Sequence, residues 1–160
     1  MLEQYHFLDG QIVKQTKLLQ ELFKNELYRE RVELLITIPG IGMTAAMEML
    51  LELQDVSRFQ RADQLAASVG CLTPSQFTSA DKVRMGRITC VGKNSLRATL
   101  VQASWALILK DGVMRGKYDR LKSRSGGKQA IVAIARTLLI RMRRMLLDNS
   151  PNVIGLLAAN

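Results

Sequence analysis

Hydroxyl groups and positive charges are interleaved over residues 71–97. A serine hydroxyl can attack phosphorus, and guanidinium groups can stabilise the charge that spreads over the phosphoryl oxygens in the transition state. Phosphoryl transfer through a covalent serine needs this combination. Loop serines more often cap helices or close turns, so composition alone also allows a purely structural role. The hydroxyls are Ser75, Thr78, Ser79 and Thr89, and the cations are Lys82, Arg84, Arg87, Lys93 and Arg97.

Other chemistries with recognisable patterns are missing from the sequence. Cys71 and Cys90 match no metal-ligand spacing, and His6 is the only histidine, so we expect no metal site. The segment "SGGKQA" differs from a nucleotide-binding P-loop, because Gln129 replaces the required Ser or Thr and no strand precedes it. We therefore expect no cofactor in this chain.

Positive charge is concentrated in the second half of the chain. Residues 1–80 hold seven lysine and arginine residues against ten acidic ones, whereas residues 81–160 hold sixteen against four. A basic half of this strength indicates a polyanionic partner, above all nucleic acid, with an ordinary solvated basic surface as the alternative. The sequence has no apolar run of membrane-spanning length and no signal peptide, so we expect a cytoplasmic protein without a membrane partner.

The periodicity of apolar residues predicts a mainly α fold with a long N-terminal helix over residues 2–37. Steps of three and four along its first half are typical of a coiled-coil seam. We expect residues 1–33 to form an arm that pairs with a second copy of the chain, making a homo-oligomer. The alternative is an arm that folds back on its own core. The seam consists of Tyr5, Leu8, Ile12, Gln15, Leu19 and Leu22.

A compact helical domain is expected over residues 34–147, followed by a loosely held tail over 148–160. Asp55 and Ser57 are candidate helix caps, and Gly70 is a candidate helix end. The helical period disappears after Gly70, which predicts an ordered loop or a short hairpin over residues 71–92. The expected helices cover residues 43–53, 61–69, 94–110, 114–122 and 128–147.

The segment "IPGIG" between the first two helices predicts a sharp reversal of the chain, since glycine takes positive φ without steric cost. It resembles the helix-hairpin-helix motif, which grips DNA phosphates without reading bases. On this interpretation Gly40, Gly42 and Thr44 contact phosphate at the start of a helix. In the alternative, the turn is a plain helical hairpin and Ile41 fills the core. The acids after the turn, such as Glu48, would have to point away from DNA.

The last helix combines an apolar stripe with basic residues. Arg136 and Arg143 are seven residues apart and share a face that could follow a phosphate backbone, and Lys128 lies at the start of the helix. The spacing of the stripe predicts that it faces the core. Its members are Ile131, Ile134, Ala135, Leu138, Met142 and Met145.

Four blocks in this order resemble the C-terminal transposase domain of the insertion sequence 110 family, whose relatives include the pilin-gene invertases. The blocks are "IPGIGMTAAMEMLLEL", "FQRADQLAASVGCLTPSQFTSADKVRMGRIT", "GKNSLRATLVQASWAL" and "GGKQAIVAIARTLL". The similarity covers about residues 34–147, and the preceding helix fits the coiled-coil segment of the family.

The resemblance implies a DNA recombinase that moves an insertion sequence while a structured guide RNA helps to choose the sites. It also implies a RuvC-like N-terminal domain with four metal-binding carboxylates, which would hold Mg²⁺, and a C-terminal domain with a nucleophilic serine. The family serine lies in a Ser-Gly pair after a Gly-Leu-x-Pro block, which corresponds here to Ser79 and Ala80. The alanine is a departure, because it leaves the backbone beside the serine less free. Gly86, Arg87 and Gly92 match the glycines and the basic residue that follow.

Two functional hypotheses remain open at this point. In the first, the chain is the serine-bearing part of a transposase, inactive alone because the RuvC-like half is not in these 160 residues. In the second, it is a non-catalytic helical module that binds DNA or RNA and dimerises, and Ser79 only shapes a loop. A weaker third hypothesis is a regulator that dimerises through residues 2–30.

Overall fold

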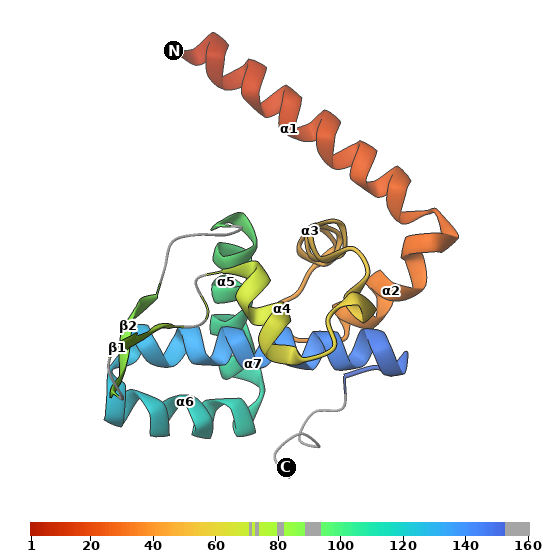
Figure 1. The fold of residues 1–160 in the computed structure, drawn as a ribbon. Coiled ribbons are helices and arrows are strands. Elements are labelled where there is room, and N and C mark those ends of the chain that lie inside the picture. Colours follow the sequence, from red (N-terminus) through yellow and green to blue (C-terminus); the bar gives the residue numbers. More distant parts are fainter. Residues whose placement is uncertain (71, 73, 80–81, 89–93, 153–160) are drawn as a thin grey trace.

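The computed structural model describes residues 1–70, 72, 74–79, 82–88 and 94–152. Helices dominate this part of the chain (Figure 1), which confirms the prediction of a mainly α fold. The elements in chain order are α1 (Leu2–Phe23), α2 (Glu26–Ile36), α3 (Met43–Leu53), the 3-10 helix η1 (Val56–Arg58), α4 (Ala62–Val69), β1 (Pro74–Ser79), β2 (Lys82–Ile88), α5 (Asn94–Lys110), α6 (Gly112–Ser125) and α7 (Gly127–Asp148).

Helix α1 extends away from the rest of the molecule (Figure 1), and none of its side chains is buried. The prediction of one unbroken helix over residues 2–37 is wrong, because α1 ends at Phe23 and a new helix begins at Glu26. Asn25 has an extended backbone, and its side chain accepts a hydrogen bond of 3.1 Å from the backbone N–H of Leu27. Asparagine favours this N-cap position over a helix interior, which explains the break.

Helix α7 runs through the middle of the body, where it contacts α2, α4, α5, α6 and η1 (Figure 1). The predicted apolar stripe of this helix is confirmed, since all six of its members are buried. Side chains three and four residues apart lie on one face of a helix, so this face supplies a continuous wall of the core. The other elements bury their apolar residues against it.

Of the predicted capping residues between α3 and α4, Asp55 and Gly70 are confirmed, whereas Ser57 lies within η1 and caps no helix. Helix α3 has the predicted bounds, and Gly70 ends α4 with a positive φ of 69°. Asp55 caps η1 and accepts hydrogen bonds from the hydroxyl of Ser57 (2.7 Å) and from its backbone N–H (2.9 Å). These hydrogen bonds, that of the hydroxyl above all, hold the pKa of Asp55 below its usual value.

Strands β1 and β2 form an antiparallel hairpin in the region where an ordered loop or a short hairpin was expected. The ladder has an irregularity between Pro74 and Gln76. From there to the turn the register pairs Gln76 with Met85, Phe77 with Arg84, Thr78 with Val83 and Ser79 with Lys82.

The end of the chain after α7 folds back onto the body as far as Asn152. Asn149 takes a left-handed conformation (φ 48°), and the backbone N–H of Asn152 donates a hydrogen bond of 3.0 Å to the hydroxyl of Thr37. The loosely held tail expected over residues 148–160 stays a prediction, and residues 153–160 lie outside the described residues. The division into an arm and a domain at residue 33 stays a prediction.

Candidate nucleic-acid interface

Ser79 is the last residue of β1, and Lys82 stands directly opposite it at the start of β2. Phe77 and Arg84 form the pair two positions further along the ladder. In an antiparallel ladder, opposite positions and positions two apart lie on the same face. The register therefore places the positions of Ser79, Lys82 and Arg84 on one face of the hairpin. Arg87 lies in the irregular part of the ladder, where the register does not assign it to a face.

The remaining predicted residues of this region are only partly described. Lys93 and Thr89 lie outside the described residues, as does Ala80 beside the candidate serine. Arg97 lies in the first turns of α5 and is half-buried. The hairpin register therefore places two of the five predicted cations, Lys82 and Arg84, on the same face as Ser79.

The turn before α3 is packed against α5 at its first glycine. Gly40 has a φ of 92°, and a Cβ added there would lie 2.6 Å from the Cβ of Ala106 and 2.7 Å from the carbonyl oxygen of Ala103. Ile41 is only 4% exposed, in agreement with the alternative in which it fills the core. Helix α5 therefore occupies the space next to the backbone of Gly40, where a polyanion was predicted to approach.

The second part of that turn remains open to solvent. Gly42 is the N-cap of α3 without a side-chain cap, and a Cβ added there would meet nothing within 4 Å. Thr44 in the first turn of α3 is exposed. Phosphate binding by Gly42 and Thr44 stays a prediction.

The acidic side of α3 faces α5. Glu48 accepts hydrogen bonds from the hydroxyls of Ser95 and Thr99, the latter at 2.6 Å. Glu48 was expected to point away from a polyanion. The structure gives the reason, because its carboxylate holds α3 against the beginning of α5. Glu48 gave no such signal in the sequence, because its partners are 47 and 51 residues away.

Arg136 and Arg143 on α7 have partners within the chain. The Nη2 atom of Arg136 lies 2.5 Å from the carboxylate of Asp63 on α4. The Nη2 atom of Arg143 donates hydrogen bonds to the carbonyl oxygens of Phe59 (2.5 Å) and Gln60 (3.3 Å). The two arginines share a face as predicted, but that face holds the connection between η1 and α4. Phosphate binding by Arg136 or Arg143 would compete with these contacts.

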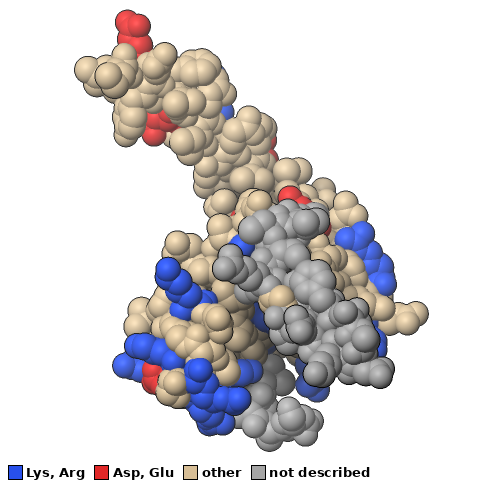
Figure 2. Space-filling model, turned by 60° about the vertical axis from the view of Figure 1, so that its left-hand side comes forward, with Lys and Arg blue, Asp and Glu red and all other residues tan. Residues whose placement is uncertain are grey.

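The basic surface that sequence reasoning missed lies on α6. Figure 2 shows lysine and arginine side chains gathered on the lower part of the body, where Figure 1 places this helix. The signal was present in the sequence, since α6 holds five cations and a single acid, Asp119, within 14 residues. Lys128, predicted to bind phosphate, is exposed just beyond the end of α6. The five cations are Arg115, Lys117, Arg120, Lys122 and Arg124.

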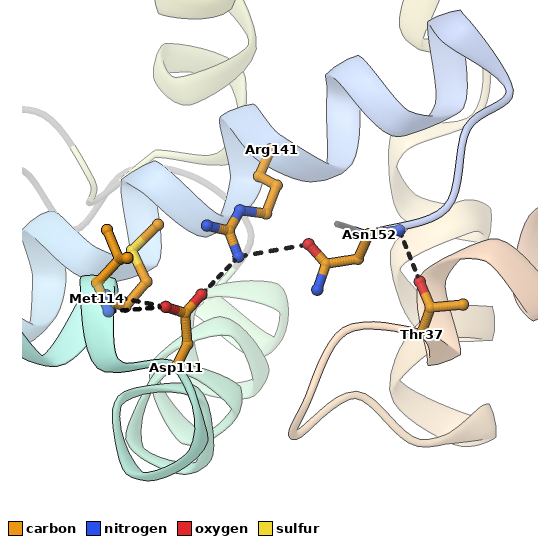
Figure 3. A network of polar contacts seen from close by, with 6 residues as sticks. Thr37, Asp111, Met114, Arg141 and Asn152 are labelled. Atoms are coloured by element: carbon orange, nitrogen blue, oxygen red, sulfur yellow. Dashed lines mark hydrogen bonds and ion pairs between the residues drawn. The ribbon is translucent and has the colours of Figure 1, made fainter. Parts of the chain in front are cut away.

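A buried polar network holds the helices behind this surface (Figure 3). The Nη1 atom of Arg141 lies 3.1 Å from the carboxylate of Asp111, and both side chains are almost fully buried. The same carboxylate caps α6 by accepting hydrogen bonds from the backbone N–H groups of Val113 and Met114. Arg141 also donates to the side-chain oxygen of Asn152 at 3.4 Å. Arg141 thus links α7 to the start of α6 and to the returning end of the chain.

The charge of Arg141 is felt by one exposed cation of α6. The Nζ atom of Lys117 donates a hydrogen bond of 3.0 Å to the hydroxyl of Thr137 on α7. Partial burial lowers the pKa of Lys117, and the nearby charge of Arg141 lowers it further. A negatively charged partner at Lys117 would offset both effects.

Among known protein families, the model of the transposase IS116/IS110/IS902 family matches residues 32–119, more than half of the chain. The chain belongs to this family. The matched range begins in α2 and ends in α6, so it contains the turn at Gly40, the hairpin with Ser79 and the whole of α5.

Curated relatives of this transposase family agree with the match. The chain is 30% identical over 141 residues to a putative transposase of Sinorhizobium fredii, covering 85% of the chain and 35% of the relative. It is 32% identical over 126 residues to a pilin gene-inverting protein of Moraxella bovis, covering 76% of the chain and 38% of the relative. The chain is 31% identical over 106 residues to the transposase for insertion sequence element IS1111A of Coxiella burnetii, covering 62% of the chain and 28% of the relative.

This member of the transposase family therefore spans about a third of the length of these relatives. No helix in the described part of the chain is long and apolar enough to span a membrane. Nor do the described residues include a group of three or more histidine, cysteine or acidic side chains that could hold a metal ion.

Proposed function

We propose that this chain is the C-terminal, serine-bearing part of an insertion-sequence transposase, which binds DNA and a guide RNA in the cytoplasm. The observation that carries the proposal is the family match over residues 32–119, which encloses the β1–β2 hairpin. Within that range, Ser79 is directly opposite Lys82, and its position shares a hairpin face with Lys82 and Arg84.

The chemistry proposed for Ser79 is attack of its hydroxyl oxygen on a DNA phosphorus. A bond forms between Oγ and phosphorus while the bond from phosphorus to a sugar oxygen breaks, and the departing oxygen takes up a proton. Lys82 and Arg84 would stabilise the negative charge that develops on the phosphoryl oxygens. We assign Mg²⁺ to the RuvC-like domain that the resemblance implies, and no step on this chain passes through a metal.

A transposition assay tests the proposal. Residues 1–160 replace the matching segment of a full-length relative, and Ser79→Ala is compared with Ser75→Ala, a matched change in the same strand. We expect Ser79→Ala to abolish transposition and Ser75→Ala to leave most of it. Transposition that survives in the Ser79→Ala chimera would remove the catalytic role.

A second candidate function is a non-catalytic module that binds nucleic acid and dimerises through α1. The apolar side chains that α1 leaves exposed favour such an association, because isolated apolar stripes on a projecting helix are usually covered by a partner. This candidate predicts that Ser79→Ala and Ser75→Ala behave alike. The exposed residues include Tyr5, Leu8, Ile12, Leu18 and Leu22.

A further inference from the structure

The five cations of α6 are accessible to a partner from outside the chain. Each of them is exposed, and none forms an ion pair with another residue in the described ranges. Two of them have a contact within the chain, since Lys117 donates a hydrogen bond to Thr137 and the Nζ atom of Lys122 lies 5.9 Å from the ring centre of Tyr118. On α7, by contrast, Arg136 and Arg141 pair with carboxylates and Arg143 donates to backbone carbonyl oxygens. Several cations on a single helix create a positively charged surface that attracts a polyanion.

The cations fall into two rows on opposite flanks of α6. An α-helix turns by about 100° per residue, so residues seven apart lie nearly in line. Met114, Tyr118 and the half-buried Leu121 mark the side that packs on the body. Neither row lies on this side or on the outermost line of the helix. One row holds Arg115 and Lys122, and the other holds Lys117, Arg120 and Arg124.

The outermost line of α6, between the two rows, is a ridge of small residues: Gly112, Gly116 and Ser123. A Cβ added at Gly112 or Gly116 would meet nothing within 4 Å, and neither glycine has a positive φ. Glycine is unfavourable in a helix interior, where Gly116 stands. Neither packing nor backbone geometry in the described part of the chain explains Gly116, whereas close approach of an external partner would.

We propose that α6 enters the major groove of a B-form DNA duplex, ridge first, with its two rows of cations reaching the phosphates on the two sides of the groove. The major groove is about 12 Å wide and admits an α-helix, and a ridge without large side chains lets the helix sit deeply. The assignment rests on the proposed function for its DNA partner. It adds the element that holds the duplex, on residues distinct from the hairpin of Ser79.

The one acid of α6 fits this placement. Asp119 lies between the ridge and the row of Arg115, on the part of the helix that would face the base edges rather than the phosphates. The floor of the major groove presents the amino groups of cytosine and adenine, which donate hydrogen bonds to a carboxylate. The only other polar side chain on the ridge is Ser123, whose hydroxyl donates to the carbonyl oxygen of Arg120, so sequence preference at this contact is slight.

The same geometry selects DNA over double-stranded RNA. The major groove of an A-form duplex is deep and too narrow for side chains to enter. An RNA duplex could therefore meet only one row of cations at a time, whereas B-form DNA meets both.

The test compares two triple variants of the 160-residue chain that remove equal charge. Arg115→Gln, Arg120→Gln and Arg124→Gln remove cations from both rows of α6, while Lys14→Gln, Lys17→Gln and Lys24→Gln remove three exposed cations at and near α1. Binding to a duplex of about 20 base pairs is measured by fluorescence anisotropy as salt is raised. We expect the α6 variant to bind DNA roughly tenfold more weakly and to show a smaller salt slope, by about 0.9 for each phosphate that is no longer neutralised. The α1 variant should stay close to wild type.

A second pair of variants separates insertion into the groove from simple attraction of charge. Gly116→Leu enlarges the ridge without changing charge, and Gly10→Leu makes the same change on α1, where an added Cβ also meets open space. We expect Gly116→Leu to weaken DNA binding severalfold while binding to an RNA duplex of equal length is unchanged. Thermal unfolding checks that both variants fold.

Two results would overturn the assignment. One is a DNA affinity of the α6 triple variant equal to that of its α1 counterpart, and the other is an equal loss of affinity for RNA and for DNA. These binding measurements do not involve Ser79, so a failure of the transposition test leaves them standing. Conversely, if α6 does not bind DNA, the loss of transposition expected for Ser79→Ala is unaffected.

Discussion

Arg141 and Asp111 carry opposite charges in a place that water does not reach, with 2% and 0% of their side chains exposed. Removing two charges from water is costly, and mutual attraction together with additional hydrogen bonds must offset this cost. The cap on α6 and the contact with Asn152 supply those hydrogen bonds. The pair therefore fixes the position of α6, the helix that we assign to DNA.

Removal of one partner of this pair should be strongly destabilising. We expect Arg141→Met to lower the free energy of unfolding by about 3–5 kcal/mol, because Asp111 would stay buried with its charge uncompensated. The double variant Asp111→Asn, Arg141→Met should recover much of the loss, since asparagine still caps α6 and carries no charge. Urea denaturation measures both. A loss below about 1 kcal/mol for the single variant would contradict this account of the pair.

Gly40 and Gly42 give a contrast within one turn. Gly40→Ala should lower the free energy of unfolding by at least about 2 kcal/mol, because alanine there meets both an unfavourable φ and the backbone of α5. Gly42→Ala should cost no more than about 1 kcal/mol, since its Cβ points into open space. Equal effects of the two changes in urea denaturation would show that α5 does not require the glycine at position 40.

At the scale of the elements, we expect α6 to be less stable than it would be with alanine in place of Gly116. Gly116→Ala should raise the free energy of unfolding by about 0.5–1 kcal/mol, because alanine is the better helix former and its Cβ meets nothing. Gly127→Ala is the matched control, since a Cβ there would lie 3.3 Å from the hydroxyl of Tyr118. Thermal unfolding distinguishes the two. A destabilised Gly116→Ala variant would mean that the fold itself needs this glycine.

The elements that the sequence predicted well are those whose signal is local. The stripe from Ile131 to Met145 and the caps at Asp55 and Gly70 depend on residues a few positions apart, so spacing alone reveals them. The break at Asn25 was missed because apolar residues recur on both sides of it, at Phe23, Leu27 and Leu34, although the seam shifts there. The spacing of apolar residues does not distinguish a polar side chain that caps a helix from one that lies within a helix.

The features that were missed depend on contacts between distant parts of the chain. Arg136 and Arg143 were assigned to phosphate from their shared face, but what faces them is set by the packing of α4 and η1. The cations of α6 were not selected from the sequence, although they form no ion pair within the described part of the chain. For Ser79, the sequence supplied the residue through its resemblance to a family, and the hairpin register added Lys82 as its opposite neighbour.

At the scale of the whole molecule, α1 is an apolar arm that buries none of its side chains on its own chain. We expect the chain to dimerise through the seam that contains Leu8 and Ile12, so Leu8→Lys with Ile12→Lys should give a monomer in light scattering. Phe7→Lys with Val13→Lys is the matched control, because these exposed apolar residues lie off the seam. The body should stay folded in both, since α1 contributes no buried residue to it. A wild-type chain that is monomeric at all concentrations would contradict this expectation.

The most direct test of the catalytic proposal is to map the covalent bond that it requires between protein and DNA. In the full-length chimera, strand exchange is stopped by denaturation on a DNA substrate nicked next to the reacting phosphate, and peptide mass spectrometry locates the attached nucleotide. We predict a phosphodiester on the hydroxyl oxygen of Ser79 that is absent from the Ser79→Ala chimera. A linkage on any other residue, or strand exchange that proceeds in the Ser79→Ala chimera, would contradict the account.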